Sequence, residues 1–411
     1  MSETHFSANG KQYTLPKRPI AVICIDGCAD EYLDESIVSG RMPHLTSVIQ
    51  RGHRFKARGA LPSFTNVNNS CIATGCPPDV TGISGNYFLD PDTGEEVMMN
   101  SAKYLRCETI FAAAANAGRK VAIVTAKEKL RDILSHKLNG VAFSSEKARE
   151  AQLDSHGIEN VEELVGEPMP EIYSGDASVY VLKAGAALIE KGQADFAYLT
   201  LTDFMQHKYA PETEEALDFY AKLDEQIGRL TDAGAIVGIT ADHGMNAKNT
   251  PAGEPNVVYL ESMLAEQFGP GNKVICPITD PYVVHHGALG SLVMVHVSDD
   301  KRTEEIGKWI LSLDGIAEVH ERSMAALKLQ LPADRIGDLV VMSTRDAAIG
   351  RTPNDHDLSL LHGGLRSHGG RYEEMVPMII SDPLNDAFVR VSQADPRNFD
   401  VFDFVCNGVR T

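Results

Sequence analysis

A continuous apolar run, AIVGIT, extends from Ala235 to Thr240 and is followed at once by the polar residues Asp242 and His243. Apolar runs rich in β-branched residues are typical of strands buried on both faces, as in the parallel sheets of α/β proteins. Such sheets bind ligands at the carboxyl ends of their strands, and an Asp beside a His is a common pair of metal ligands. An Asp that merely caps the next helix is the competing interpretation of this stretch taken alone.

Two other predicted strands end in the same way. The run IAVICID begins at Ile20 and stops at Asp26, and DFAYLTLTD stops at Asp203. His207 follows Asp203 by four residues, so a helical turn after the strand would bring both side chains near one face, at a spacing that suits a metal ion. Three buried strands that each end in an aspartate predict a shared metal site at one edge of a sheet.

Strand-like and helix-like segments alternate from Ile20 to Met245, which predicts a doubly wound, mostly parallel α/β sheet between helices. After Met245 the chain is rich in breakers and then mixes short strands with helices. We expect residues 247–365 to form an inserted, smaller α+β cap domain that packs firmly against the rest. Residues 1–246 and 366–411 would form the metal-binding catalytic core.

Thr65 follows the chain breakers Pro62 and Ser63 and stands at the start of a predicted helix that ends at Gly75. A hydroxyl at this position is usually an N-cap, and the local pattern favours that interpretation. The alternative is a nucleophile, because the unpaired N–H groups and the positive end of a helix would stabilise an alkoxide and an incoming phosphoryl group.

A segment rich in Gly, Pro and Asp, residues 77–94, is predicted to be a long loop that contains Asn86, and its length hints at a binding role. Lys127, Lys129 and Arg131 come directly after the predicted strand KVAIVTA. Alternating charges are typical of the exposed first turn of a helix. Alternatively, the two lysines face the cleft and hold an anionic group, and a contribution from Arg131 stays open.

The chain of 411 residues has a formal net charge of −19, which disfavours nucleic acid or an anionic membrane surface as a partner. Its first residues lack the apolar core of a signal peptide, and no run is long enough to span a bilayer. The seven cysteines are scattered, so we expect reduced thiols in a cytoplasmic protein. Cys24 and Cys28 are predicted to be buried or near-surface thiols and not metal ligands.

Taken together and in order, these motifs resemble the alkaline phosphatase superfamily, specifically its nucleotide pyrophosphatase/phosphodiesterase-like branch. The motifs that carry the resemblance are Asp26, Thr65 in PSFTNVNNSCIATG, DFMQH from Asp203 to His207, ADHGM with Asp242 and His243, and SHGGRYEEMVP with His368. They span almost the whole chain. The resemblance implies an alkaline-phosphatase-like α/β fold and a hydrolase that uses two metal ions.

Carried over position by position, the resemblance implies two Zn²⁺ ions per chain. One would be held by Asp203, His207 and His368, and the other by Asp26, Asp242 and His243. Thr65 would be the nucleophile, its alkoxide favoured by the second zinc ion. His368 has rivals in His362 and His356 and is chosen because it alone leads directly into the apolar run MVPMII.

Within this branch, the chain looks most like enzymes that hydrolyse phosphonoacetate, a small phosphonate, to acetate and phosphate. The substrate contacts implied by this resemblance are Thr65, Asn86 in GNYF, Lys127 and Lys129 in TAKEKL, and His207. The chemistry requires such cations, because a carbanion is a poor leaving group unless its charge spreads onto the carboxylate and is stabilised there.

The nearest alternative is a phosphodiesterase or nucleotide pyrophosphatase that uses the same zinc ions and would need an aromatic platform for its base. A non-catalytic protein that binds metal or phosphonate is a second alternative, against which the complete set of ligands argues. Cys76 in GCPPD resembles the sulfatase cysteine motif, but the Arg expected after it is missing. His285 and His286 match no ligand of the family and are predicted to be structural. A homodimer is compatible with the sequence.

Overall fold

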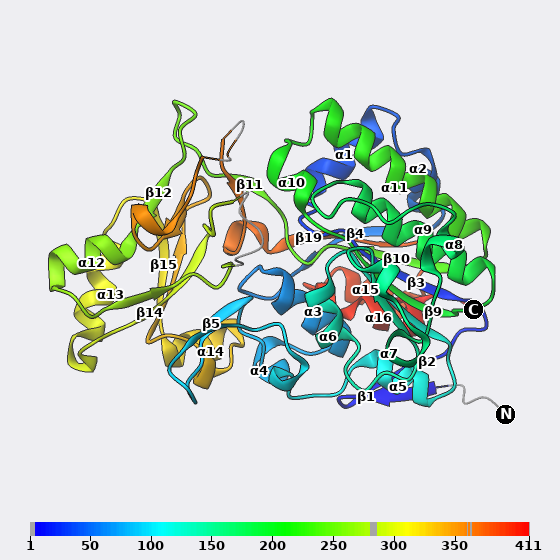
Figure 1. Ribbon diagram of the computed structural model, residues 1–411, viewed down its shortest axis with the longest axis horizontal. Helices are drawn as coiled ribbons and strands as arrows, with labels where there is room; N and C mark the ends of the chain where they lie inside the picture. The colour runs from blue at the N-terminus through cyan, green and yellow to red at the C-terminus, as the bar shows by residue number, and fades with distance from the viewer. Residues whose placement is uncertain (1–4, 280–285, 360, 362–363, 411) are drawn as a thin grey trace.

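The computed structural model describes residues 5–279, 286–359, 361 and 364–410, and a seven-stranded sheet lies at the centre of its larger lobe (Figure 1). In spatial order the strands are β4 (His53–Arg58), β19 (Met375–Ile380), β10 (Ile236–Thr240), β3 (Ile20–Cys24), β9 (Phe196–Thr200), β7 (Val121–Thr125) and β8 (Val141–Ser144). Neighbours pair in parallel from β10 to β8, whereas β19 is antiparallel to both β10 and β4. The predicted mostly parallel α/β sheet is confirmed.

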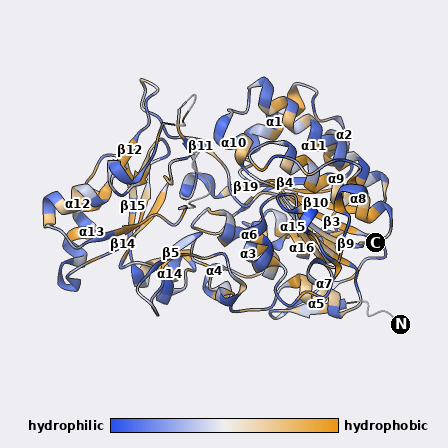
Figure 2. Ribbon diagram, in the orientation of Figure 1, coloured by the Kyte–Doolittle hydropathy of each residue, from blue (hydrophilic) through white to orange (hydrophobic). Residues whose placement is uncertain are grey.

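Alternate residues of the central strands point into two separate hydrophobic clusters, one on each face of the sheet. In β3, Ile20 and Val22 belong to one cluster and Ala21 and Ile23 to the other. The face of Ala21 is covered by α1 (Asp30–Val38), α2 (Pro43–Arg51), α9 (Asp176–Glu190) and α11 (Glu214–Asp232). The opposite face is covered by α3 (Thr65–Thr74), α5 (Ile110–Asn116), α6 (Glu128–Leu134) and α16 (Val401–Asp403). Figure 2 shows the hydrophobic residues concentrated on these inner surfaces, which explains why the strands read as continuous apolar runs.

The smaller lobe, on the left of Figure 1, contains a second sheet that is antiparallel throughout. Its strands are β13 (Lys273–Ile275), β14 (Leu292–His296), β16 (Leu339–Ser343) and β15 (Ile316–Glu321), and its helices are α12 (Leu260–Phe268), α13 (Thr303–Leu311) and α14 (Arg322–Leu329). Its buried side chains join the same hydrophobic cluster as one face of the main sheet, so this lobe packs firmly against the core. The boundaries of the cap domain, residues 247–365, stay a prediction.

Shorter elements connect these layers. They are β1 (His5–Ala8), β2 (Lys11–Thr14), α4 (Pro78–Thr81), β5 (Tyr87–Leu89), β6 (Glu96–Met98), α7 (Leu153–His156), α8 (Val161–Val165), α10 (Phe204–Lys208), β11 (Asn246–Ala247), β12 (Val257–Tyr259), β17 (Ala348–Gly350), β18 (Arg366–Ser367) and α15 (Asp386–Ser392). The prediction of an unbroken loop over residues 77–94 is wrong, because α4 and the β5–β6 hairpin form there. In α4, Pro77 is the N-cap and Pro78 is the first helical residue. At these positions an N–H group would have no partner within the helix, so its absence costs nothing.

All seven cysteines lie in the described residues and are free thiols, as predicted. Cys24 and Cys28 are fully buried and belong to neither metal cluster described below. Within the part of the chain that the structure describes, no helix is both long and apolar enough to cross a membrane.

Candidate active site

The three aspartates that follow buried strands lie together because the strands are in register. Thr240 of β10 pairs with Cys24 of β3, and Cys24 pairs with Thr200 of β9. Asp26 and Asp242 each follow two residues after these paired positions, and Asp203 follows after three. The carboxylates therefore lie at one edge of the sheet, where parallel strands place ligands.

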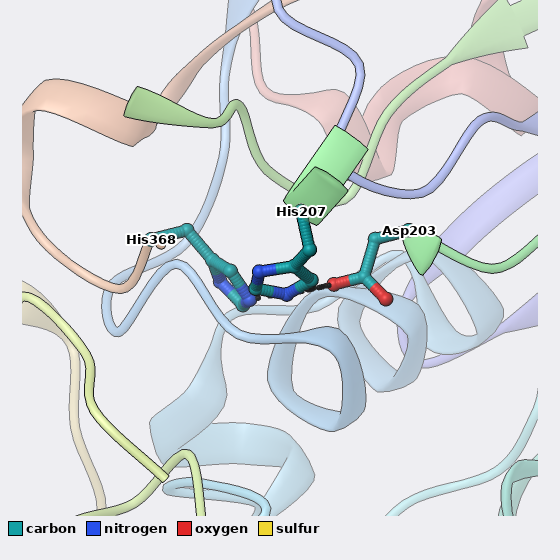
Figure 3. Close-up of side chains that lie close together, drawn as sticks. All are labelled: Asp203, His207 and His368. Atoms are coloured by element: carbon teal, nitrogen blue, oxygen red, sulfur yellow. Dashed lines mark ion pairs between the residues drawn. The ribbon is translucent and has the colours of Figure 1, made fainter. Parts of the chain in front are cut away.

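The first candidate metal cluster consists of Asp203, His207 and His368, which converge from two segments of the chain (Figure 3). Nε2 of His207 lies 2.9 Å from Oδ2 of Asp203, and Nε2 of His368 lies 3.5 Å from the same oxygen. As predicted, the chain turns helical after Asp203, and α10 carries His207. All three side chains are buried.

The second metal cluster consists of Asp26, Asp242 and His243. Nε2 of His243 lies 3.2 Å from Oδ1 of Asp26 and 3.7 Å from Oδ2 of Asp242. The two clusters are adjacent, because the rings of His243 and His368 stack with their centroids 3.5 Å apart. In each cluster the potential ligand atoms lie within 4.8 Å of one another.

All three histidines are oriented in the same way by the main chain. Nδ1 of His207, His243 and His368 donates to the carbonyl oxygens of Arg366, Gly244 and Ser63, at 2.8, 2.9 and 2.8 Å. A carbonyl oxygen only accepts, so the proton resides on Nδ1 and the lone pair of each Nε2 faces the carboxylates. A cation placed between Nε2 and the carboxylate oxygens would accept lone pairs from both kinds of atom. A hydrogen bond from the other ring nitrogen to a backbone carbonyl is typical of histidines that bind metals.

The electrostatics of the site also fit metal binding. Burial, followed by repulsion from Asp203 and Asp242, raises the pKa of Asp26 well above its usual value. Burial opposes ionisation of Asp203 too, but its interactions with His207 and Lys127 outweigh burial and hold the pKa of this carboxyl well below its usual range. Three buried carboxylates in one place call for positive charge, and two sets of three oxygen and nitrogen ligands suit Zn²⁺ with positions left for substrate.

Asn69 supports the second cluster and was not identified from the sequence. Its Nδ2 donates to Oδ2 of Asp242 at 3.1 Å, while its Oδ1 accepts from Tyr198 at 2.7 Å and from Thr200 at 2.9 Å. The amide therefore links a carboxylate of the second cluster to strand β9. The available signal was an Asn four residues, or about one helical turn, after Thr65.

Thr65 is the first residue of α3, and the residue at its N-cap is Phe64, which makes no side-chain capping bond. By contrast, Thr109 does cap its helix, accepting from the N–H of Ala112 at 3.1 Å. The hydroxyl of Thr65 instead lies 3.4 Å from Nε2 of His243. The N-cap interpretation of Thr65 is therefore wrong, and its side chain points at the metal clusters.

Asn86 lies at the same helix end as Thr65. Its Oδ1 accepts from the backbone N–H of Asn66 at 3.0 Å, and its own N–H donates to the carbonyl of Pro277 at 2.8 Å. The residue is thus held between the amino-terminal end of α3, where Thr65 lies, and the segment that follows β13.

Lys127 and Lys129 lie both at the start of a helix and on the wall of a pocket. Lys127 is the N-cap of α6 and Lys129 lies in its first turn, yet both line a pocket of about 210 Å³ together with Tyr173. Nζ of Lys127 lies 3.8 Å from Oδ1 of Asp203, so this pocket opens beside the first metal cluster. Arg131 bonds to Glu128 within the helix at 2.7 Å and does not line the pocket.

Four other histidines were considered in the sequence as ligands or structural residues. His362 and His285 lie outside the described residues. Both ring nitrogens of His356 are bonded to main chain, Nδ1 with the carbonyl of Gly287 and Nε2 with the N–H of Arg351, so it is no ligand. His286 is 3% exposed, and its ring lies 4.9 Å from that of His207. It therefore packs against a candidate metal ligand, a position that the sequence pattern did not indicate.

A sequence model described as "Type I phosphodiesterase / nucleotide pyrophosphatase" matches residues 20–371, a range that includes all six potential metal ligands. The chain belongs to the type I phosphodiesterase/nucleotide pyrophosphatase family. The resemblance to this branch of the alkaline phosphatase superfamily, inferred from the motifs, is confirmed.

Solved structures place the chain more narrowly within the type I phosphodiesterase family. Phosphonoacetate hydrolase from Sinorhizobium meliloti 1021 in complex with phosphonoformate is 44% identical, with a TM-score of 0.93 and coverage of 99% of each chain. Its complex with phosphonoacetate matches at 43% identity with the same TM-score and coverage. Murine ectonucleotide pyrophosphatase/phosphodiesterase 5 shares the fold, at 14% identity and a TM-score of 0.63, over 95% of this chain and 94% of that one.

Proposed function

We propose that this chain is a zinc-dependent hydrolase that cleaves the carbon–phosphorus bond of phosphonoacetate to give acetate and phosphate. The observation that carries the proposal is the position of Lys127, 3.8 Å from the carboxylate of Asp203, on the wall of a pocket shared with Lys129. A substrate with two anionic ends would bind the metal clusters with one end and the lysines with the other. The 44% identity to an enzyme that acts on phosphonoacetate supports this assignment.

Zn²⁺ bound in the two clusters would polarise the phosphonate oxygens and lower the pKa of the Thr65 hydroxyl. The phosphonate would lie beside Thr65, between the two clusters, near His207. Because Oδ1 of Asn86 accepts the N–H of Asn66, the Nδ2 group of Asn86 is the end that would donate to a phosphonate oxygen. The carboxylate would extend toward Lys127 and Lys129.

In the first step, Oγ1 of Thr65 loses its proton to solvent water and forms a bond to phosphorus while the carbon–phosphorus bond breaks. The electron pair of that bond passes to the departing carbon and spreads onto the carboxylate as an enolate, which the two lysines stabilise. The enolate takes a proton from water to become acetate. In the second step, water attacks the phosphothreonine, phosphate leaves and the hydroxyl of Thr65 is restored.

A phosphodiesterase or nucleotide pyrophosphatase is the second candidate, and one observation favours it. The aromatic ring of Tyr173 is half exposed and lines the same pocket as the lysines, where it offers a surface for a nucleobase. Against it, Lys127 and Lys129 line this pocket beside Glu128 and Glu146, and a lysine ammonium binds the carboxylate of a small dianion better than a neutral base.

The deciding experiment combines metal analysis with two assays on the same preparation. Phosphate release from phosphonoacetate is measured beside nitrophenol release from bis(4-nitrophenyl) phosphate. We expect two zinc ions per chain and a kcat/KM for the phosphonate well above that for the diester. A preference for the diester would establish the second candidate. Two bound zinc ions without turnover of any phosphonate or ester would indicate a non-catalytic binding protein.

We propose the cytoplasm as the site of action, because seven free thiols suit its reducing conditions.

A further inference from the structure

Arg366 lies in β18, two residues before the metal ligand His368. Strand β18 pairs antiparallel with β11. The first residue of β11 is Asn246, three residues after the ligand His243. The carbonyl oxygen of Arg366 accepts the Nδ1 proton of His207 at 2.8 Å. Arg366 therefore lies next to each of the three segments that carry His207, His243 and His368.

The side chain of Arg366 contacts the helix that carries His207. Its Nε donates to the carbonyl oxygen of Gln206 at 2.8 Å, and its Nη2 donates to the hydroxyl of Tyr32 at 2.9 Å. Gln206 is the neighbour of His207 in α10, which has only five residues. A helix this short is not stable by itself, so its orientation depends on contacts of this kind.

Tyr32 completes the arrangement from the other side. Its hydroxyl donates to the carbonyl of Tyr209 at 2.7 Å and lies 3.2 Å from that of Gln206. The Tyr32 ring is 1% exposed and stacks on the ring of Tyr220, with centroids 5.4 Å apart. The guanidinium of Arg366 and the hydroxyl of Tyr32 thus bind the carbonyl groups at the end of α10 from a rigid base.

We propose that Arg366 and Tyr32 are positioning residues that form a clamp on α10 and set His207 for metal binding in the first cluster. Within the described part of the chain, neither clamp side chain forms a hydrogen bond or ion pair with Asp26, Asp242 or His243. Asp242 is held instead by Asn69, the N–H of His243 and the N–H of Gly27. Removing the clamp should therefore weaken zinc binding at one site and spare the other.

The inference rests on the proposed function only in assuming that the two clusters hold zinc, and its test needs no substrate. Zinc is titrated into metal-free protein in competition with a chromogenic chelator, for the wild type and for Arg366→Met. We expect two tight sites in the wild type. In the variant we expect one unchanged site and one weakened about 10- to 100-fold, as is typical when a support of a metal ligand is lost.

Two reference variants identify the affected site. His207→Ala disables the first cluster and His243→Ala the second. Arg366→Met should weaken the same site that His207→Ala disables, and adding Arg366→Met to His243→Ala should weaken the one site that remains. Tyr32→Phe keeps the stacked ring but loses the hydroxyl, so it should give a smaller loss at the same site.

Arg119→Met is the matched control. Its guanidinium also donates to two backbone carbonyls, those of Pro16 and Asp195, but at the opposite edge of the sheet. This variant should keep both sites. If Arg366→Met fails to fold, Arg366→Lys and Tyr32→Phe carry the same test. Wild-type affinity at both sites in the clamp variants, or equal weakening of both, would overturn the inference. Fewer than two zinc ions in the wild type would instead refute the proposed function.

Discussion

The hydroxyl of Thr65 lies 3.4 Å from Nε2 of His243, at the amino terminus of a helix that it does not cap. As the proposed nucleophile, Thr65 should be essential. We expect Thr65→Ala to lower kcat by at least ~10³-fold, because the covalent route is lost. Thr65→Ser should retain part of the activity.

Zinc analysis of both variants is the control, because neither substitution removes a proposed ligand. Phosphate release under single-turnover conditions measures the effect. Near wild-type turnover by Thr65→Ala with two zinc ions bound would rule out the threonine as nucleophile.

Lys127 and Lys129 should act on substrate choice and not on the shared chemistry. Each charge-assisted hydrogen bond to the substrate carboxylate contributes about 1.5–3 kcal/mol. We therefore expect Lys127→Met or Lys129→Met to lower kcat/KM for phosphonoacetate about 10- to 100-fold, with activity on a diester largely kept.

Lys120→Met is the matched control, since Lys120 immediately precedes β7 while Lys127 follows it by two residues. This change should leave both activities as they are. Equal losses on the two substrates in the Lys127 and Lys129 variants would indicate that the lysines serve the metal site and not the carboxylate.

Metal removal should destabilise the fold, because Asp26, Asp203 and Asp242 are then left as buried carboxylates without cations. Ligand binding at 100 times Kd stabilises a protein by about 2.7 kcal/mol per site. We expect a chelator to lower the Tm and added zinc to restore it, measured by calorimetry.

Asp242→Asn tests whether repulsion between buried carboxylates causes the lower Tm of the metal-free protein. The substitution removes one buried negative charge and one ligand, so the difference in Tm between the zinc-bound and metal-free forms should shrink. An unchanged difference would mean that repulsion at the second cluster does not limit stability.

Lys248 and Glu373 form an ion pair of 2.8 Å with both side chains completely buried. Glu373 also accepts from Asn246 and from the N–H of Gly370, and Lys248 donates to the carbonyl of Arg345 on the smaller lobe. The ion pair therefore links the two segments in which the chain passes between the larger and the smaller lobe. Breaking it in Lys248→Met should cost about 3–5 kcal/mol of unfolding free energy, because a buried carboxylate is left unpaired.

Replacing both partners, in Lys248→Met/Glu373→Leu, should recover much of that loss, as judged by denaturant unfolding. Additive costs in this double-mutant cycle would show that the two side chains do not act as a pair.

Several features of the site were predictable from local sequence. The apolar runs before Asp26, Asp203 and Asp242 indicate buried parallel strands, and the carboxyl ends of such strands share one edge of a sheet. The four-residue spacing of Asp203 and His207 needs only one helical turn, which α10 provides. The prediction over residues 77–94 failed because Gly and Pro mark turns but do not show that a short helix and a hairpin lie between them.

By itself, the sequence predicted the central sheet, the family and, through the resemblance to that family, the two candidate sets of metal ligands, because strand periodicity and motif order are properties of neighbouring residues. Only the tertiary structure decided that Thr65 faces His243, that Lys127 reaches Asp203, and that Asn69 holds Asp242. The supports of His207 by Arg366 and His286 also became visible only there. The physical reason is that these contacts join segments far apart in the chain, and no local pattern records which partner a polar side chain meets when the elements pack together.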